Sequence, residues 1–325
     1  MSKVRIAFIG AGSLANNHHY PSVSSLPDVE LAAVCDLVPE RAHKTAERWG
    51  VPRVYQDHKQ MLAEVDPQAV YVIMPPQHLF EPASYALKQG RHVFVEKPPA
   101  LTTHQTRALA HFAEQHQCLT QTGFQRRHIP AMTALRRRVE ERGPIHTVSV
   151  SFLKPTRFLD RHAGYYDGAI DPLTSDGIHA VDNLRWLAGG DVVDVVSTVH
   201  TRFVPGAFAN AITAHVTFSS GAVGLLHFSL VTGQRIFRAE FHGQNVTAYV
   251  DADRESYIVA DGGQPEVHPS KSFAEEVGSQ PHHIQGFWNE SRHFVDCIKE
   301  SRQPSSNFHD AIKTMELVDR IYQGR

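Results

Sequence analysis

The chain has 325 residues, of which 42% are hydrophobic and 20% are charged, and its formal net charge is −2. These proportions are those of a globular protein; they exclude a disordered, collagen-like or coiled-coil chain, and the length suggests two domains. No excess of positive charge draws the chain to nucleic acid or to an anionic membrane, and no apolar run has the roughly 18 residues that a membrane span needs.

The first part of the chain alternates short apolar strands with helices. The predicted strands cover residues 3–9, 29–35, 69–74, 92–96 and 118–122. The predicted helices follow Gly12 to about residue 26 and cover about 39–49, 81–87 and 102–116. This alternation is typical of a doubly wound parallel α/β sheet, to which we assign residues 1–122.

The pattern changes at residue 123, and we assign residues 123–325 to a second domain of the α+β class. Its predicted helices cover about 129–141, 178–187, 285–300 and 308–322, and the stretch 262–283 is predicted as a loop. A strand at 146–153 and a series of strands between residues 192 and 259 predict a large, mostly antiparallel sheet. The few helices can cover only one face of it, so we expect the other face to need a partner chain in a homodimer or homotetramer.

Three cysteines, Cys35, Cys118 and Cys297, lie far apart in the sequence and show neither a disulfide framework nor metal-ligand spacing. We therefore expect a reducing compartment, the cytoplasm. The N-terminal segment combines two basic residues, a short apolar run and small residues, as a signal peptide does. A strand that leads into a glycine turn explains these residues better.

A glycine motif follows the first predicted strand. Gly10, Gly12 and Ala15 match the pattern G-x-G-x-x-G/A between a strand and a helix. Gly10 permits the tight turn, Gly12 lets a pyrophosphate approach the backbone, and Ala15 allows close packing of helix on strand. With Ser13 and Leu14 at the helix start, the motif predicts a dinucleotide-binding Rossmann domain.

Asp36 closes the second predicted strand, 21 residues after Ala15. A carboxylate there accepts hydrogen bonds from a ribose diol and repels a 2′-phosphate, which favours NAD over NADP. Arg41 lies close by in sequence and keeps NADP open as an alternative, because an arginine can accommodate the extra phosphate.

Glu96 and Lys97 stand at the carboxyl end of a buried strand, where ligands bind in open α/β sheets. Lys97 is a candidate to give a proton or a hydrogen bond to a reacting oxygen, or is a surface lysine before a turn. His179 and Asp182 are three residues apart and share one helix face, so His179 is a candidate proton-transfer residue with Asp182 as its orienter. The alternative is a half-buried histidine after a helix cap at Ser175 or Asp176.

In its ordered set of motifs the chain resembles the Gfo/Idh/MocA family, the glucose–fructose and inositol dehydrogenase-like oxidoreductases. The resemblance covers nearly the whole length. It is carried by GAGSLA at 10–15, Asp36, Pro75, Ala86-Leu87 with Gly90, His92-Val93, EKP at 96–98, GFQRR at 123–127 and GIHAVDNLRWLAG at 177–189.

The resemblance implies an NAD(P)-dependent oxidoreductase that transfers hydride between nicotinamide and a hydroxyl/carbonyl carbon of a sugar, cyclitol or related polyol. The implied catalytic residues are Lys97, His179 and Asp176. The implied cofactor-binding residues are Gly10, Gly12, Ser13, Leu14, Ala15, Asp36, Pro75, Glu96 and Lys97. The expected substrate-binding residues are Lys97, Arg127, Lys154, Tyr166 and His179, with Arg157 and Tyr165 as further candidates. For the four residues between 154 and 166, packing within the loop is the alternative role.

One departure from the family pattern concerns the acid that usually precedes the histidine by four residues. Ser175 stands at that position, and Asp176 follows it. Two alternatives stay open beside a dehydrogenase: an NAD-retaining glycosidase that acts by oxidation and elimination, and a non-catalytic regulator on the same fold. The 22 histidines include adjacent pairs that lack the spacing of a helical ligand pair, so no metal is predicted.

Overall fold

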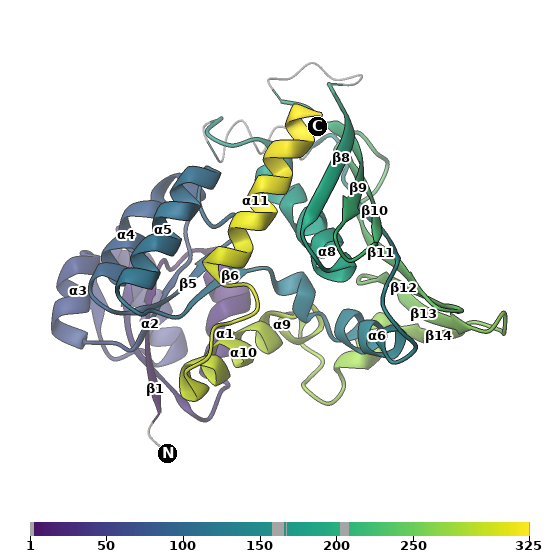
Figure 1. Ribbon diagram of the computed structural model, residues 1–325. Coiled ribbons are helices and arrows are strands. Elements are labelled where there is room, and N and C mark those ends of the chain that lie inside the picture. Colours follow the sequence, from purple (N-terminus) through teal and green to yellow (C-terminus); the bar gives the residue numbers. More distant parts are fainter. Residues whose placement is uncertain (1–2, 158–165, 167, 202–207, 325) are drawn as a thin grey trace. The chain divides into compact units, whose positions relative to one another are not determined.

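In the computed structural model, which describes residues 3–157, 166, 168–201 and 208–324, the chain divides into two compact units (Figure 1). Unit 1 comprises Met1–Gln125 and Phe287–Ile312, and unit 2 comprises Arg126–Gly286 and Lys313–Arg325. The division by sequence placed everything after residue 122 in the second domain, whereas the structure groups the segment Phe287–Ile312 with the first unit.

Unit 1 is built on a six-stranded parallel sheet of order β3-β2-β1-β4-β5-β6. Its strands are β1 (Val4–Ile9), β2 (Val29–Cys35), β3 (Val54–Tyr55), β4 (Ala69–Val72), β5 (His92–Glu96) and β6 (Thr120–Gly123). The strand order reverses between β1 and β4, as in the doubly wound dinucleotide-binding fold. The predicted α/β class is confirmed, and β3 is a short strand that was not predicted.

Helices cover both faces of this sheet, which explains why β1, β2, β4 and β5 are mainly apolar, whereas β6 is polar in sequence and still buried. One face packs against α3 (His58–Val65), α4 (Pro76–Lys88) and α5 (Thr103–Gln115). The other face packs against α1 (Tyr20–Ser24), α2 (Pro39–Trp49) and α10 (Phe287–Glu300). The helix α3 was not predicted; the side chain of Asp57 begins it by accepting a hydrogen bond from the backbone N–H of Lys59.

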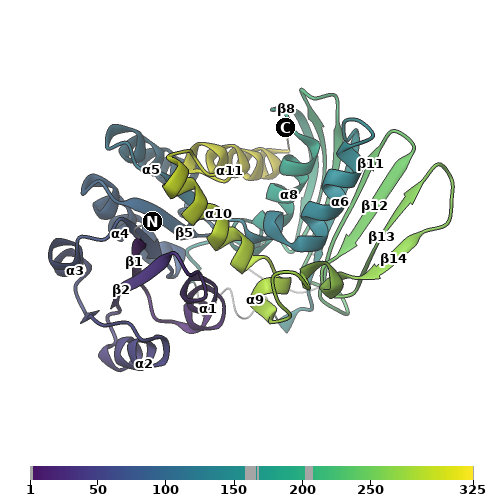
Figure 2. The same cartoon turned by 90° about the horizontal axis from the view of Figure 1, so that it is seen from below.

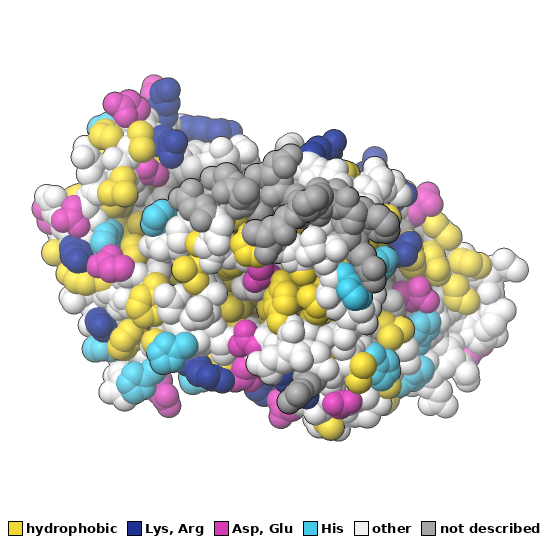
Figure 3. Space-filling model, turned by 90° about the horizontal axis from the view of Figure 1, so that it is seen from above, with side chains coloured by type: hydrophobic (Ala, Val, Ile, Leu, Met, Phe, Trp, Pro, Cys, Tyr) yellow, Lys and Arg dark blue, Asp and Glu magenta, His cyan; other side chains and the backbone are white. Residues whose placement is uncertain are grey.

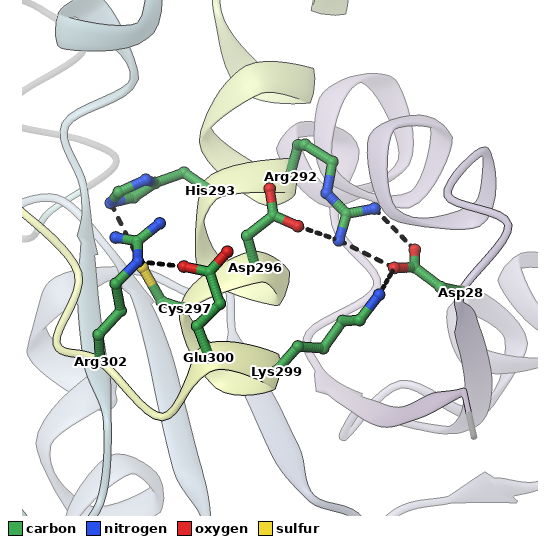
Figure 4. Close-up of polar contacts among 8 residues, drawn as sticks. All are labelled: Asp28, Arg292, His293, Asp296, Cys297, Lys299, Glu300 and Arg302. Atoms are coloured by element: carbon green, nitrogen blue, oxygen red, sulfur yellow. Dashed lines mark hydrogen bonds and ion pairs between the residues drawn. The ribbon is translucent and has the colours of Figure 1, made fainter. Parts of the chain in front are cut away.

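The helix α10 belongs to unit 1 because it packs Phe294, Val295 and Ile298 into the core of that unit. An ion-pair network reinforces the packing (Figure 4). Arg292 binds both carboxylate oxygens of Asp28, at 2.7 and 3.1 Å, and Lys299 binds the same carboxylate at 2.6 Å. Charged groups of one helix thus hold the turn between α1 and β2.

Unit 2 is built on an eight-stranded sheet of order β14-β13-β12-β11-β7-β10-β9-β8. Its strands are β7 (Thr147–Leu153), β8 (Val192–His200), β9 (Ala211–Phe218), β10 (Val223–Ser229), β11 (Ile236–Gly243), β12 (Val246–Asp251), β13 (Glu255–Ala260) and β14 (Glu266–Pro269). All neighbours pair antiparallel except β7 and β10, which are parallel, so the predicted mostly antiparallel sheet is confirmed.

The two helices α6 (Pro130–Glu140) and α8 (Ile178–Ala188) lie on one face of this sheet (Figure 2). The covered face presents large apolar side chains, among them Phe152, Phe228 and Phe237, all buried. The last helix, α11 (Phe308–Gln323), begins in unit 1 and ends in unit 2. The stretch predicted as a loop, 262–283, contains β14, the 3₁₀ helix η4 (Ser270–Ala274) and part of α9 (Pro281–Ile284).

Within the described part of the chain, no helix combines the length and the apolar character that crossing a membrane requires. On the face seen in Figure 3, basic and acidic side chains are interspersed. No single sign of charge dominates that face.

Candidate active site

The glycine turn after β1 is shaped by a close approach of two backbone segments. Gly10 has a φ of +115°, and a Cβ atom there would lie 2.1 Å from the carbonyl oxygen of Ile73. Only glycine fits this position. A Cβ atom at Gly12 would meet nothing within 4 Å, so the space over that backbone is open to a ligand. Ala15 is fully buried, as close helix packing requires.

The segment after the turn starts as a π-helical turn, η1 (Ala15–His19), and continues as α1. Ser13 and Leu14 are exposed at its start. The backbone N–H groups at such a start are suited to an anionic group, and the open space over Gly12 fits the pyrophosphate of a dinucleotide.

The Asp36 carboxylate lies beside this turn. One oxygen accepts a hydrogen bond from the backbone N–H of Ala11 at 2.8 Å, and the other accepts one from the N–H of Val38 at 2.9 Å. These bonds fix the carboxylate at the end of β2, next to the glycine turn of β1, where a ribose diol would be bound. The side chain is half-buried, so it remains open to a ligand.

Two exposed apolar side chains that were not predicted as site residues, Leu37 and Val38, follow this carboxylate in the chain, and the predicted Leu14 is also exposed. Leu37 is 86% exposed, Val38 is 37% exposed, and Leu14 is 40% exposed at the start of η1. Large exposed apolar side chains around a polar group are typical of a surface that binds a flat ring. The place of Leu37 and Val38 directly after an aspartate that follows a strand was the signal available in the sequence.

A buried polar pair lies beneath the end of β5. His19 is fully buried, Glu96 is 4% exposed, and His19 Nε2 lies 2.8 Å from Glu96 Oε1. The other oxygen of Glu96 accepts a hydrogen bond from the backbone N–H of Lys97 at 3.0 Å. A Cβ atom at Gly123 would lie 3.1 Å from Glu96 Oε1, so the neighbouring strand leaves room for the carboxylate and little more.

The pair connects the segment after the glycine turn to the strand that carries Lys97. The His19 ring is surrounded by the rings of Tyr71, Phe94 and Phe287, all in edge-on geometry. Lys97 follows directly, half-buried, and Pro75 is the N-cap residue of α4, after the neighbouring strand β4. Unit 1 therefore places the predicted cofactor residues and Lys97 along the carboxyl ends of β1, β2, β4 and β5.

Unit 2 brings together two of the predicted residues from segments 22 positions apart in the sequence. Lys154 follows β7, and its Nζ lies 2.5 Å from Asp176 Oδ2. The Lys154 backbone is fixed by hydrogen bonds to the carbonyl of Ser229 and from Thr232. An acid and a base are thus joined where the carboxyl ends of the parallel strands β7 and β10 meet.

A second π-helical turn, η3 (Leu173–Gly177), determines which side chain before His179 is accessible. Ser175 is fully buried, whereas Asp176 is partly exposed and bound to Lys154. A Cβ atom at Gly177 would lie 2.8 Å from the Phe228 ring, so glycine lets this turn pack directly on β10. The acid one residue later in sequence is therefore the one presented at the surface of the turn. His179, 4% exposed, lies in the first turn of α8.

Arg127 and Asp182 form a buried ion pair in unit 2. Arg127 Nε donates to Asp182 Oδ2 at 2.7 Å, Nη2 donates to Oδ1, and the Thr314 hydroxyl donates to Oδ1 at 3.1 Å. These contacts hold α8 against η2 (Gln125–His128) and α11. Arg127 and Asp182 therefore stabilise the packing of these helices. The substrate-binding role of Arg127 and the orienting role of Asp182 towards His179 stay predictions.

The neighbouring Arg126 was not among the predicted site residues, yet its surroundings are unusual. Its guanidinium lies 3.8 Å from the centre of the Phe237 ring and 5.7 Å from that of Phe152. It is 8% exposed, and its Nε makes no hydrogen bond with any described residue. Burial, with Arg235 adding like charge, lowers the pKa of Arg126 to about 9. Two adjacent arginines look alike in sequence, and no signal there separates their roles.

Several predicted contacts contribute less to this picture. Tyr166 is partly exposed, Arg157 is exposed, and Tyr165 lies outside the described residues. A hollow of about 630 Å³ opens at the opposite end of the unit 2 sheet, beside His146, His242 and Asp261, and so lies away from Lys154 and Asp176. Among the described residues, no group of three or more His, Cys, Asp or Glu side chains is arranged to hold a metal ion.

Comparisons with known proteins identify both parts of the chain. Residues 4–124 match the model of the oxidoreductase family with an NAD-binding Rossmann fold, and residues 133–249 match the model of the Gfo/Idh/MocA C-terminal domain. The chain belongs to the Gfo/Idh/MocA oxidoreductase family. It is an oxidoreductase with an NAD-binding Rossmann fold, as predicted.

Individual relatives agree with this assignment. The chain is 25% identical to scyllo-inositol 2-dehydrogenase (NAD(+)) of Bacillus subtilis over 97% of its own length and 92% of the relative. It is 31% identical to D-glucoside 3-dehydrogenase of Escherichia coli over 60% of its own length and 57% of the relative. The crystal structure of a dehydrogenase from Chromobacterium violaceum has the same fold, with a TM-score of 0.87, 21% identity and coverage of 99% and 95%. None of these names supports the glycosidase or regulator alternatives.

Proposed function

We propose that this Gfo/Idh/MocA protein oxidises a secondary hydroxyl of a sugar, cyclitol or related polyol with NAD, or reduces the corresponding carbonyl. The observation that carries the proposal is the arrangement in unit 1: an open glycine turn, a fixed carboxylate at Asp36, and Lys97 on one set of strand ends. The names of the relatives, an inositol dehydrogenase and a glucoside dehydrogenase, support the substrate class.

NAD supplies the hydride acceptor when it is bound. The residues that would hold it are Gly10, Gly12, Ser13, Leu14 and Ala15 at the phosphates, Asp36 at the ribose, and Pro75, Glu96 and Lys97 towards the reacting end. Leu37 and Val38 offer an apolar surface next to the ribose site. The carboxylate of Asp36 favours NAD over NADP, because it would repel a 2′-phosphate.

Lys97 and His179 are proposed to act on the same substrate hydroxyl. One of them takes the hydroxyl proton as the hydride leaves, and the other donates a hydrogen bond to the oxygen and positions it. Asp176 and Lys154, joined at 2.5 Å, are proposed to hold further hydroxyl groups of the substrate. A carboxylate bound to an ammonium group offers both an acceptor and donors to a polyol.

The test is a screen of sugars, cyclitols and sugar acids with NAD and with NADP, following nicotinamide absorbance. A dehydrogenase changes the absorbance in proportion to substrate consumed. Lys97→Ala and His179→Ala should each lower kcat/KM by about 10²-fold or more, the scale of a lost proton-transfer group. Lys44→Ala, an exposed residue of α2, is the control. Full activity in Lys97→Ala would contradict the proposed mechanism.

We also propose that the protein works in the cytoplasm. Cys35, Cys118 and Cys297 are all free thiols and all buried. Burial raises the pKa of Cys297 to about 11, so this thiol is unreactive at neutral pH even though His293 lies 3.7 Å away (Figure 4). Cell fractionation would test the location.

A further inference from the structure

Two cationic side chains in unit 2 lie over one aromatic pair. Phe152 of β7 and Phe237 of β11 are neighbours in register, and both rings point to the helix-covered face of the sheet. The Arg126 guanidinium lies 3.8 Å from the centre of the Phe237 ring, and Lys154 Nζ lies 5.0 Å from the centre of the Phe152 ring. Both cations are only 8% exposed.

The cations at this place outnumber the carboxylates: Arg126, Lys154 and Arg235 lie near Asp176 and Asp253. Lys154 is paired with Asp176, at 2.5 Å. Arg126 forms no ion pair or hydrogen bond with any described residue, and its buried Nε has no acceptor. The ring of Phe237 stabilises the positive charge by a cation–π contact but accepts none of the five N–H donors of a guanidinium. A buried cation to which no carboxylate is directly bound is costly, because its lost hydration is not replaced.

We propose that Arg126 anchors an anionic group, a carboxylate or a phosphate, on the hydroxylated substrate. The planar donor set of a guanidinium matches both groups with two parallel hydrogen bonds. The proposal rests on the proposed function, because it assigns the substrate class of the same site: Lys154 and Asp176 would bind hydroxyl groups beside the anion. Burial and the like charge of Arg235 lower the pKa of Arg126, and the nearby carboxylates of Asp253 and Asp176 oppose this shift without binding the guanidinium.

The experiment compares matched ligands that differ in one charged group. Binding to the NAD-loaded protein is measured by calorimetry, and kcat/KM by nicotinamide absorbance, for uronic acids against aldoses, aldonic acids against alditols, and hexose phosphates against hexoses. We expect the acidic member of at least one pair to bind about tenfold more tightly than its neutral partner. The pairs with a sugar acid test for a carboxylate, and the pairs with a hexose phosphate test for a phosphate.

Variants then assign the effect to Arg126. Arg126→Gln should remove the preference for the acidic ligand, with a loss of about tenfold or more for the acid and less than about threefold for the neutral partner. Arg126→Lys, which keeps the charge, should retain part of the preference. Arg137→Gln, which removes a charge from an exposed arginine of α6, should leave the preference within about twofold of the native protein.

The outcomes are distinguishable. Equal or tighter binding of the neutral member in every pair would overturn the anion site while leaving the dehydrogenase intact. Equal losses for both members in Arg126→Gln would show that Arg126 has only a packing role on Phe237. If no polyol of either kind binds or turns over, the proposed function and the anion site fail together. The ligand comparison uses the native protein, so it decides the question even if Arg126→Gln does not fold.

Discussion

Asp36 shows how one side chain can both shape a turn and select a ligand. Its two carboxylate oxygens accept hydrogen bonds from the N–H groups of Ala11 and Val38, which fixes a negative charge beside the glycine turn. We therefore predict that NAD binds at least about tenfold more tightly than NADP, a difference of about 1.4 kcal/mol. Calorimetry with both cofactors measures this directly.

The matched variants are Asp36→Asn and Arg41→Gln. The asparagine keeps one oxygen acceptor for the turn and removes the charge. The affinities for NAD and NADP should therefore differ by no more than about threefold in this variant. Arg41 is exposed on α2, and its removal should leave the NAD preference unchanged. Tighter binding of NADP to the native protein would show that Asp36 does not face the ribose.

For single residues, the sequence indicated which side chains belong to the site but could not indicate which side chains they contact. Asp36 and the glycines were predictable because each is required by a local turn. Lys154 and Asp176 were predicted separately, and their ion pair depends on two segments that only the folded unit brings together. Arg126 and Arg127 are adjacent residues of the same type, and their side chains have different partners. Arg127 is bound to Asp182, and Arg126 lies over the ring of Phe237.

Among the elements, the segment η1 and the strand β5 are joined by the buried pair of His19 and Glu96. Glu96 also accepts a hydrogen bond from the backbone N–H of Lys97. The pair should therefore fix the position of the Lys97 backbone at the end of β5. His19→Phe fits the surrounding aromatic rings but leaves Glu96 without its donor. We predict a loss in kcat of about tenfold, with the Kd for NAD within about twofold of the native value.

The conservative variant separates positioning from packing. In His19→Gln, the amide nitrogen takes the place of His19 Nε2 and can donate to Glu96, so kcat should recover to within about threefold. Thermal unfolding of both variants shows whether either loses stability. An unchanged kcat in a folded His19→Phe would show that Lys97 does not depend on the pair.

The attachment of α10 to unit 1 gives a prediction for stability. The hydrogen bonds from Arg292, followed by those from Lys299, hold the pKa of the Asp28 carboxyl well below its usual value. A carboxylate whose pKa is lower in the folded state contributes stability above its unfolded pKa of about 3.9, and this contribution is lost as the pH falls towards the folded pKa. Asp28→Asn should cost about 1–2 kcal/mol at pH 7.

The measurement is denaturant unfolding of the native protein and Asp28→Asn between pH 3 and pH 7. The difference in the free energy of unfolding should be constant above about pH 5 and shrink below it. Glu47→Gln, an exposed residue of α2, is the control for losing one carboxylate. A difference that does not change with pH would mean that the charge on Asp28 contributes nothing.

Elements with a strong local pattern were predictable to within a few residues. The strand at 92–96 and the helices near 103–115 and 130–140 were found because apolar runs or helical periodicity have clear ends. The two-residue strand Val54–Tyr55 is too short to show a period, and it exists only because it pairs with β2. The membership of α10 in unit 1 depends on which core accepts its apolar face, and the sequence of the helix does not say.

For the whole molecule, the class of fold followed from the order of strands and helices, and the family followed from the ordered motifs. The sheet of unit 2 has one face that no helix of the described residues covers. Along β8, β9 and β10, the face away from α6 and α8 presents Val196, His215 and Leu225 in one row. Val196 is 61% exposed and Leu225 is 45% exposed. No helix among the described residues covers this face (Figure 2).

Exposed β-branched and leucine side chains on a broad sheet face are typical of an interface between chains. We predict that the protein is a homodimer or homotetramer that uses this face, and that light scattering at micromolar concentration gives at least twice the mass of one chain. Leu225→Glu places a charge in this row and should shift the equilibrium to the monomer, because a buried unpaired carboxylate is costly. Gln115→Glu adds the same charge to the exposed end of α5 and should leave the mass unchanged. A native protein that runs as a monomer would contradict the prediction, and an oligomer that survives Leu225→Glu would place the interface elsewhere.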